Sequence, residues 1–101
     1  MAQVKVGLLA TLVAKPGKEE EVAGFLSSAL SLANQEARTI VWFAYRIDAR
    51  TFGVFDAFAG EEGRAAHLTG PIASALMAKA PELFAEPPRI ERHDILAAKL
   101  T

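Results

Sequence analysis

Two side chains in this sequence, Asp56 and His67, are candidates to act as a base toward a small substrate. Asp56 lies on one face of an expected strand, and that face is otherwise apolar, with Phe52, Val54 and Phe58. A carboxylate in such a place is either paired with a cation or has a raised pKa that suits it to accept a proton. Arg46 and Arg92 are the candidate cations, and the residues alone leave both interpretations open.

His67 stands three residues before a Gly70-Pro71 step, within a segment of helical spacing. An imidazole titrates near neutral pH, so it can serve as a general base or orient a substrate. A helical wheel places His67 away from the centre of the apolar stripe, which favours an exposed histidine without a function. Because Gly70-Pro71 can reset the phase of the helix, a functional position remains open.

Trp42 and Tyr45 are aromatic residues that could line a pocket for a flat ligand, with the indole N–H and the phenol O–H fixing its orientation. Core or interface positions explain the same pattern.

Other chemistry has little support. There are no cysteines, the two histidines lie in different elements without a second ligand at helical spacing, and residues 60–63 fit no nucleotide-binding fingerprint. We expect neither a metal site nor a bound cofactor.

The bulk properties set the class of protein. A chain of 101 residues has room for one domain, spanning residues 1–101. Eleven basic and 12 acidic residues give a net charge of −1, which argues against nucleic acid or an anionic membrane as partner. No apolar run approaches the roughly 20 residues of a membrane span, and the N-terminus has no signal-peptide pattern. We expect a complete, untargeted, cytoplasmic domain.

The hydrophobic periodicity predicts the order β-α-β-β-α-β. Period-two alternation and β-branched or aromatic content predict strands over residues 4–14, 39–47, 51–58 and 90–100. Helical spacing predicts helices over residues 18–33 and 60–80, the second divided at Gly70-Pro71, with one further turn over 81–85. Two βαβ halves with right-handed crossovers give a ferredoxin-like α+β fold, with one four-stranded antiparallel sheet.

The predicted sheet is apolar on both faces. The strand over residues 39–47 places Val41, Phe43, Tyr45 and Ile47 on one side, and Ile40, Trp42 and Ala44 on the other. Leaving three or four large side chains in water would forfeit about 1.5–3 kcal/mol of burial free energy for each. Together they would also form a larger exposed apolar patch than a soluble monomer normally has. We therefore expect a homodimer. The alternative is a monomer in which the C-terminal strand or loops cover the second face.

Four segments in this order resemble the antibiotic biosynthesis monooxygenase family: Pro16-Gly17-Lys18 with the three glutamates after it, Trp42-Phe43-Ala44-Tyr45, the strand from Phe52 to Phe58, and Ala66-His67-Leu68. The resemblance covers almost the whole chain. It implies a dimeric ferredoxin-like α+β barrel. It also implies oxygenation without metal, flavin or haem, in which an electron-rich phenol, hydroquinone or anthrone is deprotonated and its anion passes an electron to dioxygen.

The same resemblance implies that His67 or Asp56 is the base and that Trp42 with Tyr45 lines the pocket. The haem-degrading branch of the fold uses an asparagine on the first strand and a tryptophan on the third. This first strand has no asparagine and the third offers Asp56 and Phe58, so haem degradation is not expected. Two non-enzymatic functions stay open: a dimer that binds a small apolar ligand without turnover, and a stress-associated dimer whose pocket is filled with side chains.

Overall fold

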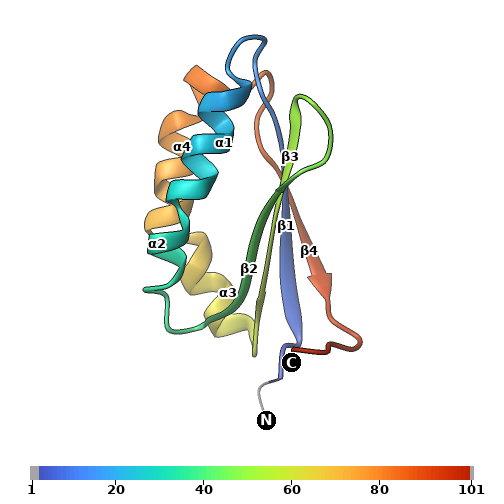
Figure 1. Ribbon diagram of the computed structural model, residues 1–101. Helices are drawn as coiled ribbons and strands as arrows, with labels where there is room; N and C mark the ends of the chain where they lie inside the picture. The colour runs from blue at the N-terminus through green and yellow to red at the C-terminus, as the bar shows by residue number, and fades with distance from the viewer. Residues whose placement is uncertain (1–2, 101) are drawn as a thin grey trace.

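All helices lie on one face of a single antiparallel sheet (Figure 1). The computed structural model describes residues 3–100. Its strands are β1 (Val6–Val13), β2 (Thr39–Arg46), β3 (Thr51–Phe58) and β4 (Arg89–Asp94), in the spatial order β2-β3-β1-β4. Its helices are α1 (Glu19–Ser28), α2 (Leu30–Ala33), α3 (Glu61–Leu68) and α4 (Pro71–Leu83). The predicted ferredoxin-like βαββαβ fold is confirmed.

Two helical segments differ in detail from their predicted course. The helix predicted over residues 18–33 is divided at Ala29, after a point where the Ser27 and Ser28 hydroxyls donate to the carbonyls of Ala23 and Phe25. Such hydroxyl bonds compete with the backbone hydrogen bonds of the helix and bend helices.

The predicted break at Gly70-Pro71 is confirmed. Helix α4 begins at Pro71 and runs through Pro81 to Leu83.

The last strand is shorter than predicted, ending at Asp94 rather than continuing to Leu100. β4 lies at the edge of the sheet and pairs only with β1, and Asp94 faces Val6, the first residue of β1. One further backbone bond joins Ile95 to Lys5. Beyond it, the described residues offer no strand for it to pair with, so alternation of apolar residues alone was insufficient to extend the strand.

The core fills the space between the helices and the sheet. Buried side chains from β1 and β3 meet those from α1 and α4, among them Leu12, Phe52, Val54, Val22, Leu26, Leu76 and Leu83. The other face of the sheet has no helix over it within residues 3–100 (Figure 1). None of the helices in this range is both long and apolar enough to cross a bilayer.

Candidate active site

Trp42 and Asp56 lie side by side on the helix-facing side of the sheet. They are directly opposed in the antiparallel β2–β3 ladder, where the Cβ atoms of opposed residues lie about 4.5–5.5 Å apart. Asp56 is only 3% exposed, between buried Val54 and Phe58 on the same face of β3. The prediction that Asp56 lies on an apolar face of its strand is therefore confirmed. The structure also shows that Trp42 is its neighbour on the adjacent strand, which the alternation alone did not indicate.

Helix α3 carries His67 to the same place. Gly63 lets α3 approach β3 closely, since a Cβ there would lie 3.2 Å from Phe58 Cβ and 3.2 Å from the Arg38 carbonyl. Arg64 fixes the helix by donating from Nη1 to the Gly7 carbonyl at 3.2 Å. One turn after Arg64, the imidazole of His67 packs against Phe58, with ring centroids 5.5 Å apart.

His67 is held between two carboxylates. Its Nε2 lies 3.1 Å from Asp56 Oδ2, and its Nδ1 lies 2.7 Å from Glu36 Oε1. Glu36 follows α2 in the chain, and its Oε1 also accepts a hydrogen bond from the Thr39 hydroxyl at 2.7 Å. A carboxylate oxygen is an acceptor when ionised, so both ring nitrogens must carry a proton to satisfy both contacts. The geometry therefore favours an imidazolium between two carboxylates.

The electrostatics agree with this assignment. Burial disfavours the charged imidazole, but the hydrogen bonds to Asp56 and Glu36 and the charges of both outweigh it and raise the pKa of His67 to about 9. Burial also raises the pKa of Asp56, and the hydrogen bond and charge of His67 offset only part of that rise. At neutral pH the cluster thus holds one cation, with a carboxyl beside it that is more basic than an ordinary aspartate.

Two buried polar atoms at this site have no hydrogen-bond partner among residues 3–100. They are Asp56 Oδ1, an acceptor, and Trp42 Nε1, a donor. Asp56, His67 and Trp42 line a cavity of about 50 Å³ between the helices and the sheet, whose other walls are apolar and include Leu8, Ala10, Phe25, Leu68, Ile72 and Leu76. Unpartnered buried polar groups are costly, and this pair, one acceptor and one donor, has the polarity that a hydroxyl would complement.

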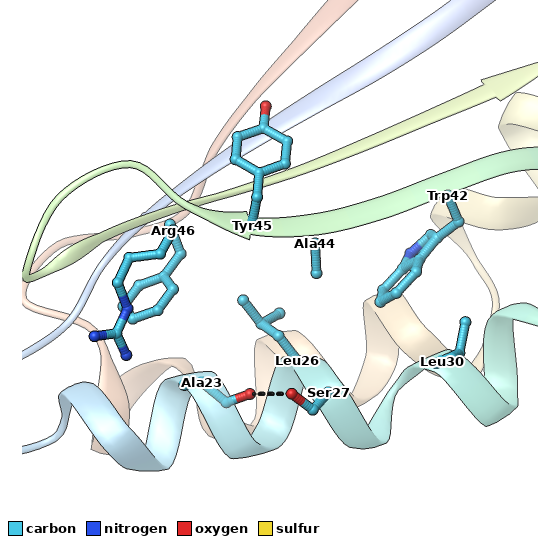
Figure 2. A pocket seen from close by; sticks show the side chains of 9 residues that line it. Ala23, Leu26, Ser27, Leu30, Trp42, Ala44, Tyr45 and Arg46 are labelled. Carbon is cyan, nitrogen blue, oxygen red and sulfur yellow. Dashed lines mark hydrogen bonds between the residues drawn. The ribbon is translucent and has the colours of Figure 1, made fainter.

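A larger groove adjoins this cavity. It has a volume of about 390 Å³ and runs between α1 and β2, and Leu26 and Trp42 line both hollows. Figure 2 shows Trp42, Ala44 and Arg46 directed from β2 toward α1, with Ser27 on the facing helix. Tyr45 borders the groove, but its ring points to the opposite side of the strand (Figure 2). Trp42 therefore stands between the open groove and the smaller cavity.

The structure overturns two expectations about Asp56 and His67. The predicted ion-pair partners of Asp56 were wrong, because Arg46 pairs with Glu20 at 3.1 Å, Arg92 is exposed, and His67 takes that place. The exposed position that the wheel favoured for His67 is also wrong, since the residue is 8% exposed. The chain breaks at Gly70, so α3 ends before it and α4 is a separate helix. A single helical wheel drawn through both helices therefore gives the wrong orientation for the imidazole of His67.

Glu36 was not predicted at all. It lies in a polar stretch that ends the helical pattern, and 31 residues separate it from His67 in the chain. Its contact arises only when α3 packs beside the segment before β2, so no local spacing could indicate it. Within residues 3–100, no group of three histidine, cysteine or acidic side chains is placed to hold a metal ion.

Comparisons with known proteins bear on the fold and the family. No protein-family model matches the chain, and no curated protein matches its sequence. Among solved structures, a protein of unknown function from Nitrosomonas europaea, NE2512, is 56% identical, with a TM-score of 0.95 over 97% of this chain and 95% of that one. The chain belongs to the same family as NE2512.

More distant neighbours connect the NE2512 family to named proteins through the fold. A putative antibiotic biosynthesis monooxygenase from Nitrosomonas europaea is 15% identical, with a TM-score of 0.81 over 95% of each chain. A possible oxidoreductase from Bacteroides thetaiotaomicron is 14% identical, with a TM-score of 0.77 over 93% of this chain and all of that one. The resemblance to antibiotic biosynthesis monooxygenases is thus confirmed at the level of the fold.

Proposed function

We propose that this protein is an oxygenase that acts on a small electron-rich aromatic alcohol, with Asp56 as the general base. The observation that carries the proposal is that Asp56 and Trp42 line one largely apolar cavity, and that each has a buried atom without a partner, Oδ1 and Nε1 respectively. A phenol or hydroquinone hydroxyl offers the complementary donor and acceptor. The fold, shared with proteins named as monooxygenases, supports the same chemistry.

In the first step the substrate hydroxyl gives its proton to Asp56 Oδ1. Burial raises the pKa of Asp56, which brings it closer to that of a phenol, about 10, and makes the transfer less unfavourable. The oxygen of the resulting phenolate accepts a hydrogen bond from Trp42 Nε1–H. A donor already oriented toward the developing charge in an apolar cavity stabilises it without reorganisation.

In the second step the phenolate passes one electron to dioxygen, which gives a phenoxyl radical and superoxide. Their combination at a ring carbon forms a C–O bond, and the proton held by Asp56 returns to the peroxide anion. Loss of water then leaves a carbonyl on that carbon. One oxygen atom stays in the product and the other leaves as water, whose two hydrogens come from the substrate hydroxyl, by way of Asp56, and from the oxygenated ring carbon. Dioxygen is the only co-reactant.

The two hollows constrain the size of the substrate. A cavity of about 50 Å³ holds only a few water molecules, since each needs roughly 10–15 Å³. Only the reacting edge of an aromatic ring fits there. The remainder must lie in the groove of about 390 Å³, so the substrate has to pass Trp42 and Leu26.

Oxygen uptake is the direct test of this proposal. Purified protein, treated with a chelator, is supplied with hydroquinones or an anthrone, and oxygen consumption is followed together with the carbonyl product. We expect one molecule of oxygenated product per dioxygen consumed. Ligand-dependent thermal stabilisation without oxygen consumption would instead favour the second function, a module that binds small aromatic alcohols without turnover. The unpartnered atoms Asp56 Oδ1 and Trp42 Nε1 would serve that second function as well, because binding a hydroxyl requires a donor and an acceptor but no turnover.

We also propose that two copies pack through the uncovered face of the sheet. Phe43 and Tyr45 are 58% and 42% exposed there, and Leu9, Val41 and Phe55 are partly exposed on the same face. An apolar patch on a chain of almost balanced charge offers little to a charged partner, whereas a twofold axis lets the same patch cover itself. A second copy of this chain is the occupant that we infer.

A further inference from the structure

We propose that the substrate carries a carboxylate at the end remote from its reacting hydroxyl, and that Arg46 binds this carboxylate. Arg46 has this role only if the hydroxyl binds beside Asp56 and Trp42, so the assignment rests on the proposed function. It adds the chemical class of the substrate, an elongated hydroxyaryl carboxylic acid, and it makes Arg46 the residue that selects that class.

Arg46 and Trp42 mark the two ends of the groove between α1 and β2. Both side chains lie on the helix-facing side of β2 with Ala44 between them, and Figure 2 shows this order along the groove. Four residues of a strand span about 13 Å, at roughly 3.3 Å per residue. Only the reacting edge of a ring fits the inner cavity, so the rest of the substrate extends from Trp42 toward Arg46.

The lining of the groove is apolar except near one end. Among residues 3–100, Arg46 is the one charged side chain that lines it, and Leu26, Leu30 and Phe52 are among its apolar neighbours. The hydroxyl of Ser27 already donates to a backbone carbonyl of its own helix at 2.9 Å. A groove of this kind complements a molecule with an apolar body and an anionic end.

The guanidinium of Arg46 is oriented before any ligand arrives. Its Cζ lies over the ring of Phe52, 4.9 Å from the ring centroid. Stacking of this kind fixes the plane of the guanidinium and leaves the N–H groups at its edges. The hydrogen bond to Glu20 engages Nη2 alone, whereas a guanidinium has five N–H donors in a fork that matches a carboxylate. Donors therefore remain for a ligand.

Glu20 is a weak competitor for the same cation. Its Oε2 lies 3.1 Å from Arg46 Nη2, but the Glu20 side chain is 85% exposed and that of Arg46 is 41% exposed. Water screens an ion pair this exposed, and such a pair contributes little. An aromatic body in the groove would displace water beside Arg46, so a carboxylate on that body would be screened less than Glu20 is.

A binding test without oxygen compares three ligands on the intact protein. The first is 6-hydroxy-2-naphthoate, with hydroxyl and carboxylate at opposite ends. The second is 6-hydroxy-2-naphthamide, which has the same shape without the charge, and the third is 3-hydroxy-2-naphthoate, which has the two groups side by side. In anaerobic calorimetry at pH 7, we expect the first to bind roughly 10-fold more tightly than either of the others.

Three variants assign this preference to Arg46. Arg46→Gln should lower the affinity for 6-hydroxy-2-naphthoate to that for the amide, while unchanged binding of the amide shows that the variant is folded. Glu20→Gln removes the competing carboxylate, so it should raise the affinity for the acid and leave that for the amide unchanged. Arg89→Gln is the matched control, because Arg89 lies outside the groove and also pairs with a glutamate, Glu91, at 3.6 Å. It should bind like the wild type.

Equal affinities of the wild type for the acid and the amide would overturn the carboxylate site. A preference for the acid that survives in Arg46→Gln would overturn it too, as would binding of none of the three ligands. Failure of the oxygenase proposal is a separate outcome, since these measurements require no turnover. Preference for the acid without oxygen uptake would reject the oxygenase and keep the carboxylate site, and oxygen uptake without that preference would do the reverse.

Discussion

Trp42 and Asp56 are directly opposed across the β2–β3 ladder and line the same cavity, and each has a buried polar atom without a partner among residues 3–100. One atom is a donor and the other an acceptor. The pair therefore has the polarity of a hydroxyl-binding site, and its surroundings are apolar. His67 and Glu36 extend this site toward the surface on the other side.

Trp42→Phe tests the role of the indole N–H while keeping an aromatic side chain. If the N–H stabilises the developing phenolate, we expect kcat to fall by roughly 10–100-fold with little change in KM. Steady-state oxygen uptake over a range of hydroquinone concentrations separates the two constants. A rise in KM at unchanged kcat would show that Trp42 only shapes the binding surface.

The ionisation of His67 should make stability depend on pH. Its folded pKa, about 9, lies above the 6.5 of an exposed histidine, so its stabilising contribution is complete below about pH 6.5 and is lost as pH rises to about 9. The shift corresponds to at most about 3 kcal/mol of the free energy of unfolding. Urea unfolding at several pH values between 6 and 9.5 measures how the free energy of unfolding changes with pH. His67→Gln should abolish it and His93→Gln should keep it; a slope that survives in His67→Gln contradicts the assignment.

The groove between α1 and β2 can be narrowed without touching the cluster. Ser27→Leu adds an apolar side chain to the groove wall, whereas Ser31→Leu, one turn farther along, lies outside it. The single tryptophan, Trp42, lines the groove and reports occupancy by its fluorescence. Under anaerobic conditions we expect Ser27→Leu to weaken binding of a naphthohydroquinone and Ser31→Leu to leave it unchanged. Equal affinities in both variants would place the ligand elsewhere.

The proposed dimer can be tested with two equally exposed apolar residues. Phe43, on the uncovered sheet face, and Met77, on α4, are each 58% exposed. We expect light scattering to give a dimer mass for the wild type at micromolar concentration, a monomer mass for Phe43→Glu, and a dimer mass for Met77→Glu. A wild-type monomer under these conditions would rule the dimer out.

Much of the fold was predictable because it depends on local periodicity. The alternation around Asp56 and the helical stripe of α1 are properties of neighbouring residues, and the prolines and glycines at the breaks act locally. The end of β4 was not predictable in this way. It depends on where its partner β1 begins, which is a property of the assembled sheet.

The candidate site was predictable only in part. Asp56 and Trp42 could be singled out by residue type and face, but their direct opposition requires the register of β2 against β3. His67 could be singled out only as a residue type, since the change of axis at Gly70 decides its burial. The contact of Glu36 with His67 joins segments that are 31 residues apart, and the chain must fold before it exists.

The proposed oxygenation depends most directly on Asp56 as the base. Asp56→Asn keeps the shape of the side chain and removes its basicity, and Glu62→Gln provides the same change on the exposed surface of α3. With a hydroquinone that the wild type consumes, we predict that oxygen uptake falls by roughly 10²–10⁴-fold in Asp56→Asn and stays at the wild-type rate in Glu62→Gln. Wild-type oxygen uptake by folded Asp56→Asn would contradict the account.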